Sequence, residues 1–471
     1  MTLKKGQEVV LKIETAAFKG KGLAKHDGLA VFVPNTAPGD TIRARITRKK
    51  KNYREAKVLE YLEYSDKRID PVCTHAKVCG GCTWQHLPYS EQLSIKEQHV
   101  RDHIERIAGL DPSIVKPILG CDQDLYYRNK MEYSFGTRRW LTEEEIRSEE
   151  YVDDSGFAAG LHAPGRYDKI LNLTECHLQD PLSYSILDFV RSYCIEQEIQ
   201  AFDTHQKTGL MRNLVIRNSH YGDDLMINIV TYRDEPEIMQ EMTDRLRNEF
   251  PQITTIVNNV NDQPNPTATG RYEHVLYGSG TIRDKIGDYE FLIDANAFFQ
   301  TNTAQAEKLY SVAAKFASES ESKLLFDLYC GVGTLTLFLS DRFEKVIGVE
   351  LVDVAVKNAR ENARRNGLGH VTFELGDMKE TFNPDFLARH GQPDCVVTDP
   401  PRAGMHPDVV KHLNDLNLDT LVYVSCNPST MARDLKTLKE TYDIERVQPV
   451  DMFPQTYHIE AVALCRGRKD S

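Results

Sequence analysis

The most constraining feature of the sequence is a regular alternation of strand-like and helix-like segments from residue 323 to the end. Five apolar runs have the length of strands, KLLFDLYC, KVIGVE, VTFEL, DCVVTD and LVYVS, and a helical or turn segment follows each. Runs without alternation of apolar and polar residues suggest strands that are buried on both faces of a parallel sheet. The pattern predicts a doubly wound α/β domain, in which ligands bind beyond the carboxyl ends of the strands.

The remaining residues predict further domains, because 471 residues are too many for a single core. Residues 1–62 contain short runs with partial period-two alternation, VVLKIE, GLAVFVP, TIRARITRKK and REAKVLEYLE, which predict a small barrel of the OB type. Residues 63–265 predict a central α+β domain with an amphipathic helix over 90–107. The α/β domain is expected to span residues 266–471.

Charge is unevenly distributed along the chain. The net charge is −12, yet residues 1–60 hold fourteen Lys or Arg against six acids, and residues 41–57 hold eight against one. In the strand TIRARITRKK, Arg43, Arg45 and Thr47 fall on one face. This basic segment predicts a polyanionic partner such as RNA, and the alternative is a solvated charged face.

The cellular location is expected to be the cytoplasm. No apolar run is long enough to span a membrane, and the start MTLKKGQEVVLKIE lacks the features of a signal peptide. Structural disulfides are rare in the cytosol, so the ten cysteines are expected to be core residues, metal ligands or catalytic thiols. A monomer is expected.

A glycine-rich turn directly after the first strand predicts a nucleoside cofactor. In the turn DLYCGVGT, which begins at Asp327, Gly331 and Gly333 allow a sharp bend and a close approach of the backbone to a ligand. The third glycine of a dinucleotide site is missing, and Glu350 ends the next strand, where an acid can bind ribose hydroxyls. These residues favour S-adenosylmethionine over a dinucleotide. Asp377, after the third strand, is placed either to reach adenine or to cap the following segment.

Two motifs at neighbouring strand ends predict the chemical site. Asp399-Pro-Pro-Arg402 ends the fourth strand and Ser425-Cys426-Asn427-Pro428 ends the fifth, so both should converge over the cofactor. Uracil C5 is a weak nucleophile, and addition of a thiolate to C6 activates it toward a methyl donor. The C5 proton must then leave, which requires a base such as Glu460 at the start of the last strand. Taken alone, Cys426 would favour a core residue, as Cys330 and Cys395 do.

A second group of cysteines predicts a metal centre. Cys73, Cys79 and Cys82 are closely spaced around Gly80-Gly81, and three ligands so close in sequence need a fourth from elsewhere. Zinc sites more often use two C-x-x-C pairs, so this spacing favours an iron–sulfur cluster. The candidates for the fourth ligand are Cys121, Cys176 and Cys194.

The motifs FFQTN, DLYCGVGT, DPPR, SCNP and HIE, in this order, resemble those of the RNA uracil-5-methyltransferase family. The first 62 residues resemble a TRAM domain, and the cysteine group resembles that of members acting on 23S ribosomal RNA. The resemblance implies Cys426 as nucleophile, Glu460 as proton acceptor, Cys176 as the fourth ligand and a 4Fe–4S cluster. It also implies a cofactor and uracil pocket. The residues implied to line that pocket are Gln300, Tyr329, Glu350 and Asp399.

The substrate implied by the resemblance is a stem-loop of 23S ribosomal RNA with a flipped uridine, and transfer RNA is the alternative. The resemblance also implies that helix 90–107 packs on the catalytic domain. Two readings from other classes stay open on the residues alone. One is an NAD-dependent iron–sulfur oxidoreductase, and the other is a non-catalytic RNA-binding assembly factor. Neither needs Cys426 together with Glu460.

Overall fold

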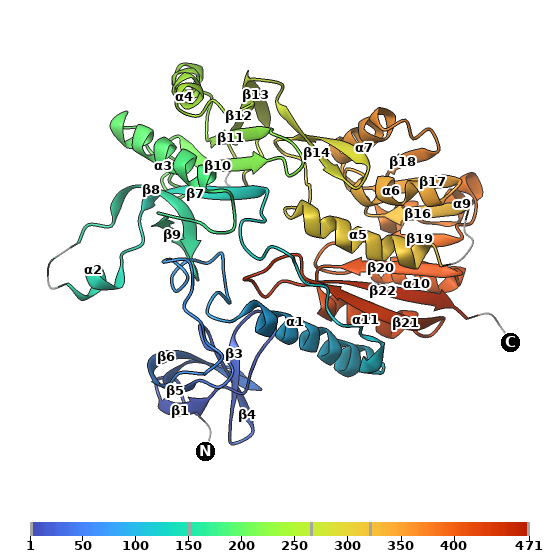
Figure 1. The fold of residues 1–471 in the computed structure, drawn as a ribbon, viewed down its shortest axis with the longest axis horizontal. Coiled ribbons are helices and arrows are strands. Elements are labelled where there is room, and N and C mark those ends of the chain that lie inside the picture. Colours follow the sequence, from blue (N-terminus) through green and yellow to red (C-terminus); the bar gives the residue numbers. More distant parts are fainter. Residues whose placement is uncertain (1–2, 149, 151, 264–266, 320–322, 469–471) are drawn as a thin grey trace. The chain divides into compact units, whose positions relative to one another are not determined.

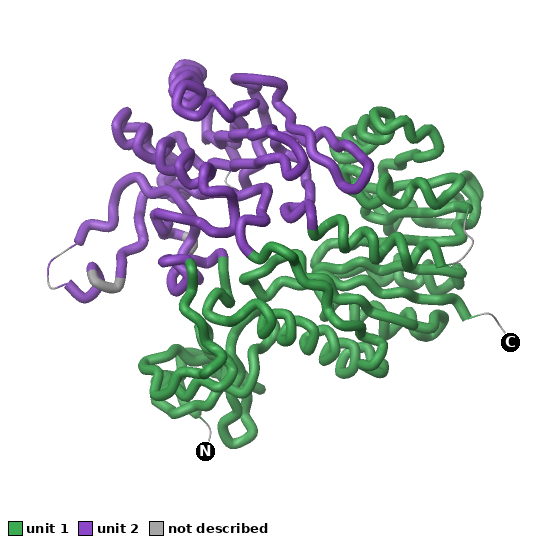
Figure 2. The backbone as a smooth tube through the Cα atoms, viewed as in Figure 1, with its two compact units in different colours: residues 1–72, 82–124, 305–471 green, residues 73–81, 125–304 purple. Residues whose placement is uncertain are grey.

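The computed structural model describes residues 3–148, 150, 152–263, 267–319 and 323–468. The chain divides into two compact units (Figure 2). The first contains residues 1–72, 82–124 and 305–471, and the second contains residues 73–81 and 125–304. The predicted barrel and the predicted α/β domain thus belong to the same unit, and the domain boundaries at residues 62 and 265 stay predictions. Across the described residues, no helix combines the length and apolar character needed to cross a membrane.

The amino-terminal barrel is a six-stranded sheet with the order β1-β5-β6-β4-β3-β2 (Figure 1). Period-two alternation directs Ile42, Ala44 and Ile46 of one strand into its core, while Arg43 and Arg45 face outward. This confirms the predicted barrel and the shared face of the two arginines. Its strands are β1 Glu8–Lys12, β2 Thr15–Ala16, β3 Gly22–His26, β4 Leu29–Val33, β5 Thr41–Lys49 and β6 Tyr53–Glu63.

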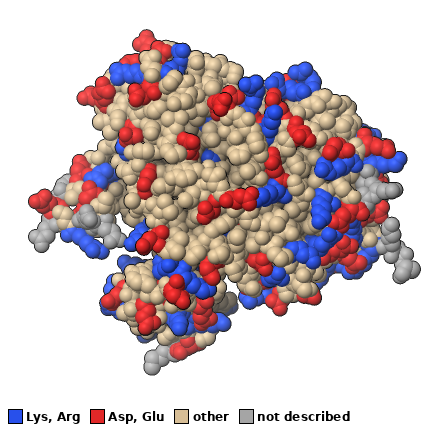
Figure 3. Space-filling view, viewed as in Figure 1, with Lys and Arg blue, Asp and Glu red and all other residues tan. Residues whose placement is uncertain are grey.

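The basic strand of the barrel is flanked by acids. Arg43 donates to Glu60 at 2.7 Å, and Arg45 donates to Glu8 at 2.8 Å. The hydrogen bond from Arg45 holds the pKa of Glu8 below its usual value. On the face that Figure 3 shows, acidic side chains lie among the basic ones of the barrel. The positive excess counted along residues 41–57 is therefore reduced in space by partners distant in sequence.

One helix links the barrel to the catalytic sheet within the first unit. α1 spans Tyr89–His103 and continues as a π-helical turn over Ile104–Ala108. Val100 and Ile104 are fully buried in the same core cluster as Leu421 and Tyr442 of the sheet. Residues of this helix and of its continuation therefore share a hydrophobic core with the catalytic sheet.

The second unit contains a seven-stranded sheet with the order β13-β12-β11-β10-β7-β8-β9 and a separate hairpin, β14-β15. The strands are β7 Lys130–Arg138, β8 Ser155–Ala163, β9 Arg166–Asn172, β10 Met211–Asn218, β11 Leu225–Thr231, β12 Thr255–Val260, β13 Tyr272–Tyr277, β14 Thr281–Ile286 and β15 Tyr289–Asp294. The helices are α2 Glu143–Arg147, α3 Pro181–Glu196 and α4 Pro236–Glu249. The predicted mixed α+β character is confirmed.

The catalytic sheet has seven strands in the order β18-β17-β16-β19-β20-β22-β21. The first five are parallel, which confirms the doubly wound prediction, and all but the edge strand β18 are almost wholly buried, while the last two strands are antiparallel. Strand order reverses at β16, so ligands are expected beyond its carboxyl end. The strands are β16 Leu324–Leu328, β17 Lys345–Glu350, β18 Val371–Leu375, β19 Cys395–Thr398, β20 Thr420–Ser425, β21 Tyr442–Val450 and β22 Glu460–Gly467.

The helices of this region cover the sheet and begin where its strands end (Figure 1). Proline occupies the first turn of α9, α10 and α11, which sets the backbone for a helix start. The helices are α5 Thr303–Ala317, α6 Thr334–Leu339, α7 Asp353–Arg365, α8 Met378–Thr381, α9 Pro384–His390, α10 Pro407–Leu416 and α11 Pro428–Leu438.

Candidate active site

The glycine-rich turn lies between β16 and α6, at the carboxyl edge of the sheet. Gly331 and Gly333 have φ values of 55° and 82°, and Tyr329 also has a positive φ of 65°. A Cβ on Gly333 would lie 2.9 Å from Phe373, whereas a Cβ on Gly331 would meet nothing within 4 Å. Gly333 is therefore needed for packing, and Gly331 leaves open space in which a ligand can approach the backbone.

The acid at the end of β17 is tied to this turn. Glu350 accepts hydrogen bonds from the backbone amides of Gly331 at 3.0 Å and Val352 at 2.9 Å. Each carboxylate oxygen keeps a further lone pair, so Glu350 can still accept ribose hydroxyls. Asp377 is exposed and accepts from the amide of Lys379 at 3.0 Å, which makes it the N-cap of α8. The structure thus gives Asp377 the capping role that the sequence left open.

Asp327 is a buried acid next to the turn. Its side chain accepts from the Thr336 hydroxyl at 2.5 Å, while its second oxygen is buried and has no partner among the described residues. Burial raises the pKa of Asp327 to about 7, and the charges of Asp399 and Glu350 act in the same direction. An unpartnered buried oxygen fits a site whose polar ligand is a separate molecule.

Strand pairing brings the predicted nucleophile and base together. In the antiparallel ladder of β20 and β22, Ser425 pairs with Ala461, so the next position places Cys426 opposite Glu460. The pKa of Cys426 is raised to about 12, mainly by burial and next by the charges of Glu460 and Asp399, while Arg402 opposes them. Burial, followed by Asp399, also raises the pKa of Glu460 well above its ordinary value. The thiol and the two carboxyl groups therefore share one electrostatic environment.

The loops after β19 and β20 are fastened to each other. The carbonyl of Arg402 accepts from the Asn427 amide at 2.9 Å and from the Thr430 hydroxyl at 3.3 Å. Buried Asp434 in α11 accepts from the hydroxyl of Tyr423 at 2.7 Å. Sequence reasoning missed these three supports. Only Asn427 carried a signal, as an N-cap residue directly before a proline.

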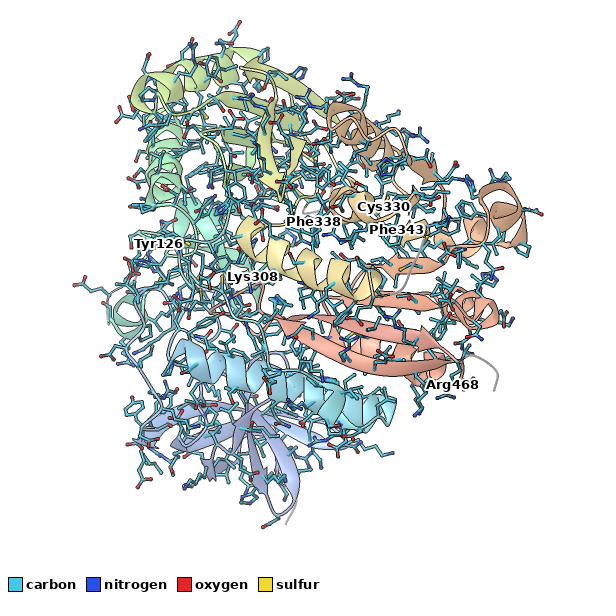
Figure 4. The ribbon with its side chains drawn as sticks, turned by 45° about the vertical axis from the view of Figure 1, so that its right-hand side comes forward. Tyr126, Lys308, Cys330, Phe338, Phe343 and Arg468 are labelled. Atoms are coloured by element: carbon cyan, nitrogen blue, oxygen red, sulfur yellow. The ribbon has the colours of Figure 1, made fainter. Side chains whose placement is uncertain are left out.

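The other cysteines of the sheet are core residues, as expected. Cys330 follows β16 and is buried (Figure 4), and Cys395 is fully buried at the start of β19. Burial raises the pKa of both thiols, which keeps them protonated and unreactive. Gln300 belongs to the second compact unit, where its backbone carbonyl accepts from the Asn129 side chain at 2.9 Å.

The structure does not support the predicted iron–sulfur site. Among the described residues, no group of three or more His, Cys, Asp or Glu side chains is arranged to hold a metal ion. Cys73, Cys79 and Cys176 lie in the second unit and Cys82 in the first. Spacing in the sequence predicted ligands, but these cysteines lie in turns and loops, where no strand ladder determines the distances between them.

The cysteine segment nevertheless has defined local contacts. Burial raises the pKa of the Cys73 thiol to about 11, and the charges of Cys79 and Cys176 act in the same direction. The amide of Gly81 donates to the sulfur of Cys79 at 3.3 Å. A Cβ on Gly80 would lie 2.9 Å from the carbonyl oxygen of His162, so the tight turn expected of the glycine pair is present.

Comparisons with known proteins agree with this arrangement. The family model for tRNA (uracil-5-)-methyltransferases matches residues 272–467, and the TRAM domain model matches residues 3–59. An uncharacterized RNA methyltransferase of Bacteroides thetaiotaomicron is 40% identical, covering 96% of this chain and 100% of its own. A second, from Chlorobaculum tepidum, is 40% identical and covers 98% of this chain and 96% of its own.

A solved structure has the same overall fold. It is the Pyrococcus abyssi tRNA (uracil-54, C5)-methyltransferase in complex with S-adenosyl-L-homocysteine, with a TM-score of 0.75 and 27% sequence identity. The match covers 97% of this chain and 100% of that one. The full-length relatives, the two domain models and this fold agree with one another. The chain belongs to the TRAM-containing family of S-adenosylmethionine-dependent RNA uracil-5-methyltransferases.

Proposed function

We propose that the protein methylates C5 of a uridine in 23S ribosomal RNA, with Cys426 as nucleophile and Glu460 as proton acceptor. The observation that carries the proposal is the ladder of β20 and β22, in which Ser425 pairs with Ala461 and the next residues along the two strands are Cys426 and Glu460. In this role Gly331, Glu350 and Asp327 hold the cofactor, Asp377 faces its adenine, and Tyr329, Asp399 and Gln300 complete the pocket for cofactor and uracil. Bound S-adenosylmethionine supplies an electrophilic methyl group.

The chemistry assigned to the side chains balances as follows. The Cys426 thiol first releases its proton to water, its thiolate adds to C6 of uracil, and the electron pair of the C5–C6 double bond moves to make C5 nucleophilic. Once C5 carries the methyl group, Glu460 accepts the C5 proton. The electrons of that C–H bond restore the double bond and expel the thiolate. Cys426 is thereby regenerated, and Glu460 must lose its proton before the next cycle.

In the free site the raised pKa of Glu460 is consistent with its role as a base, whereas the raised pKa of Cys426 holds its thiol protonated until a nearby positive charge favours the thiolate. A buried carboxyl group with a raised pKa is a stronger base than an exposed one. The site gathers acidic groups with Arg402 as an opposing cation. A cationic ligand placed among these carboxyl groups would favour their ionised forms, and would therefore prepare Glu460 to accept a proton.

A transfer RNA is the second candidate substrate. The solved tRNA (uracil-54, C5)-methyltransferase covers 97% of this chain, including the region of the barrel, so the barrel alone does not separate the two RNA classes. Support for ribosomal RNA comes from the cysteine segment and its resemblance to members acting on 23S RNA. We expect the enzyme to act as a cytoplasmic monomer, with the barrel (1–62) and the central domain (63–265) binding the RNA and residues 266–471 carrying the chemistry.

We retain a 4Fe–4S cluster on Cys73, Cys79, Cys82 and Cys176 as part of the proposal. Its support is the spacing of the cysteines and the amide hydrogen bond to the sulfur of Cys79. Such N–H···S hydrogen bonds accompany thiolate ligands of iron–sulfur proteins. No step of the methyl transfer depends on this cluster.

Mapping 5-methyluridine in total RNA from cells with and without the gene tests the substrate. Loss of the modification at one or more positions of 23S RNA is expected. Loss confined to transfer RNA would favour the second candidate. An unchanged map, together with no transfer of labelled methyl from S-adenosylmethionine to RNA in vitro, would overturn the proposed function.

A further inference from the structure

The loop of residues 451–459 joins β21 to β22 and ends at Glu460. Val450 and Glu460 are paired at the end of the ladder, so the loop is the closing turn of this hairpin. Internal hydrogen bonds shape it, among them those from the Phe453 amide to Asp451 at 3.0 Å and from the Thr456 hydroxyl to the Phe453 carbonyl at 2.8 Å. Glu460 is the first residue of β22, so the conformation of this loop determines the position of its carboxyl group.

A buried ion pair attaches the loop to α1. Nζ of Lys96 lies 2.6 Å from Oδ1 of Asp451, and both side chains are fully inaccessible to solvent. Lys96 also donates to the carbonyl of Phe453 at 3.1 Å, and the hydroxyl of Tyr89 donates to the second oxygen of Asp451 at 3.0 Å. Every polar group of the pair thus has a partner within the loop or the helix.

A second link, one turn away on α1, is reciprocal. The Gln92 side chain donates to Oε1 of Gln455 at 2.9 Å, and its own oxygen accepts from the Gln455 amide at 2.9 Å. The Gln455 carbonyl accepts from the amides of Thr83 and Trp84 at 2.8 and 3.0 Å. Gln455 has a positive φ of 67°, a conformation that these hydrogen bonds maintain.

Stability alone does not account for this arrangement. A buried ion pair adds little net stability relative to apolar residues of the same volume, because both charges lose their hydration. The stabilising contacts of α1 are apolar, through Val100 and Ile104. Directional polar contacts define one geometry where apolar packing tolerates several, and here those of Tyr89, Gln92 and Lys96 converge on the loop that leads to Glu460.

We propose that Lys96 is a positioning residue for proton removal, acting through Asp451 and the loop 451–459 on Glu460. This inference rests on the proposed function, in which Glu460 accepts the C5 proton. It assigns α1, which is remote in sequence from the catalytic motifs, a part in the second half of the reaction. Formation of the bond between Cys426 and C6 does not depend on it.

The test separates the two halves of the reaction. In Lys96→Met we expect turnover to fall roughly 10-fold to 100-fold, as for a small misplacement of a reacting group. Covalent capture of RNA containing 5-fluorouridine should stay near the wild-type level, since that analogue has no C5 proton to remove. With ordinary RNA the covalent adduct should accumulate. A variant that only destabilises the fold would lose capture and turnover together.

Two further variants complete the design. Arg101→Met removes a cation of the same helix that pairs with Glu97 and donates to the Pro112 carbonyl, and it should leave turnover unchanged. The double variant Lys96→Met, Asp451→Asn removes both buried charges and should recover part of the lost turnover, because no unpaired charge remains. Should Lys96→Met fail to fold, Gln92→Ala breaks the second link and should show the same split between capture and turnover.

The outcomes distinguish this inference from the function on which it rests. If Glu460→Gln accumulates the adduct and a folded Lys96→Met or Gln92→Ala does not, the positioning role is wrong. If Glu460→Gln itself accumulates no adduct and turns over normally, the proposed function fails, whatever the α1 variants do.

Discussion

In two regions of the molecule, cysteines in the sequence led to a predicted chemical role. The arrangement of these cysteines in the structure differs between the two regions. At the carboxyl edge of the catalytic sheet, the predicted nucleophile and base lie at opposite positions of one strand ladder. In the cysteine segment, the predicted ligands are not gathered into a metal-holding group among the described residues. The motifs were equally regular in the sequence. What differs is the local structure in which the cysteines lie.

A strand ladder converts position along the chain into position in space, because paired strands run at a constant spacing and side chains alternate between the two faces. Cys426 and Glu460 are 34 residues apart in the sequence, yet the ladder leaves only one relative placement for them. Turns impose no such relation. Cys73 and Cys79 are separated by five residues, a spacing that many loop conformations satisfy.

The largest effect on activity is expected from removing the strand-end thiol. We expect Cys426→Ala to reduce methyl transfer by about 10⁴-fold or more, since C5 then lacks its activating step. Capture of 5-fluorouridine RNA, measured as a band of reduced mobility, should vanish. Cys465→Ala removes a buried thiol from the far end of β22 and should retain capture. Capture by a folded Cys426→Ala protein would remove the basis of the comparison.

Replacing the carboxyl group of Glu460 tests the other half of the predicted catalytic pair. Glu460→Gln keeps the shape of the side chain and loses the base, so turnover should fall by about 10² to 10⁴-fold. The methylated covalent adduct should accumulate on ordinary RNA, because the thiolate cannot be expelled while the C5 proton remains. Glu445→Gln on the neighbouring strand, which is exposed, is the matched control and should behave as wild type. Rapid release of product by Glu460→Gln would exclude it as the proton acceptor.

The buried acids at the carboxyl edge of the catalytic sheet should make the stability of the protein depend on pH, an effect not expected from the cysteine segment. The folded-state pKa of Asp327 is raised to about 7 from an ordinary value of 3.8, so the protein favours its protonated form. Its contribution to stability is present below about pH 4 and is lost as the pH rises toward 7. The free energy of unfolding of wild type relative to Asp327→Asn should therefore decrease by roughly 2 to 4 kcal/mol over that interval. Parallel curves in denaturant titrations would contradict this.

Most of the catalytic sheet could be predicted from the sequence, because apolar runs such as KVIGVE and VTFEL coincide with β17 and β18. Cys426 and Glu460 followed from the chemistry of uracil and from their strand-end positions. Asp434 and Asn427 were missed as supports because their partners are backbone groups or residues distant in sequence. Lys96 was missed because it reads as one of several cations on an amphipathic helix, and its burial depends on a loop 355 residues later.

The charge of the barrel is a second feature that could not be predicted correctly from the sequence alone. Counting along residues 41–57 predicts a strongly basic surface, but Glu8 and Glu60 lie opposite Arg43 and Arg45 once the strands pair. A linear count misses such pairing, because it compares neighbours in the chain and not neighbours across a sheet. Exposed ion pairs of this kind contribute little stability, so the arginines remain free to exchange a carboxylate for a phosphate.

The smallest effect on turnover, and the sharpest test of the contrast between the two regions, comes from the cysteine segment. Protein purified without oxygen should contain iron and acid-labile sulfide, and Cys176→Ser should lose both. Cys121→Ser, which removes the competing candidate, should keep them. Turnover should fall less in Cys176→Ser than in any catalytic variant, because no step of the methyl transfer uses the cluster. Iron-free wild-type protein with full activity would mean that regular cysteine spacing in turns does not imply a metal centre in this chain.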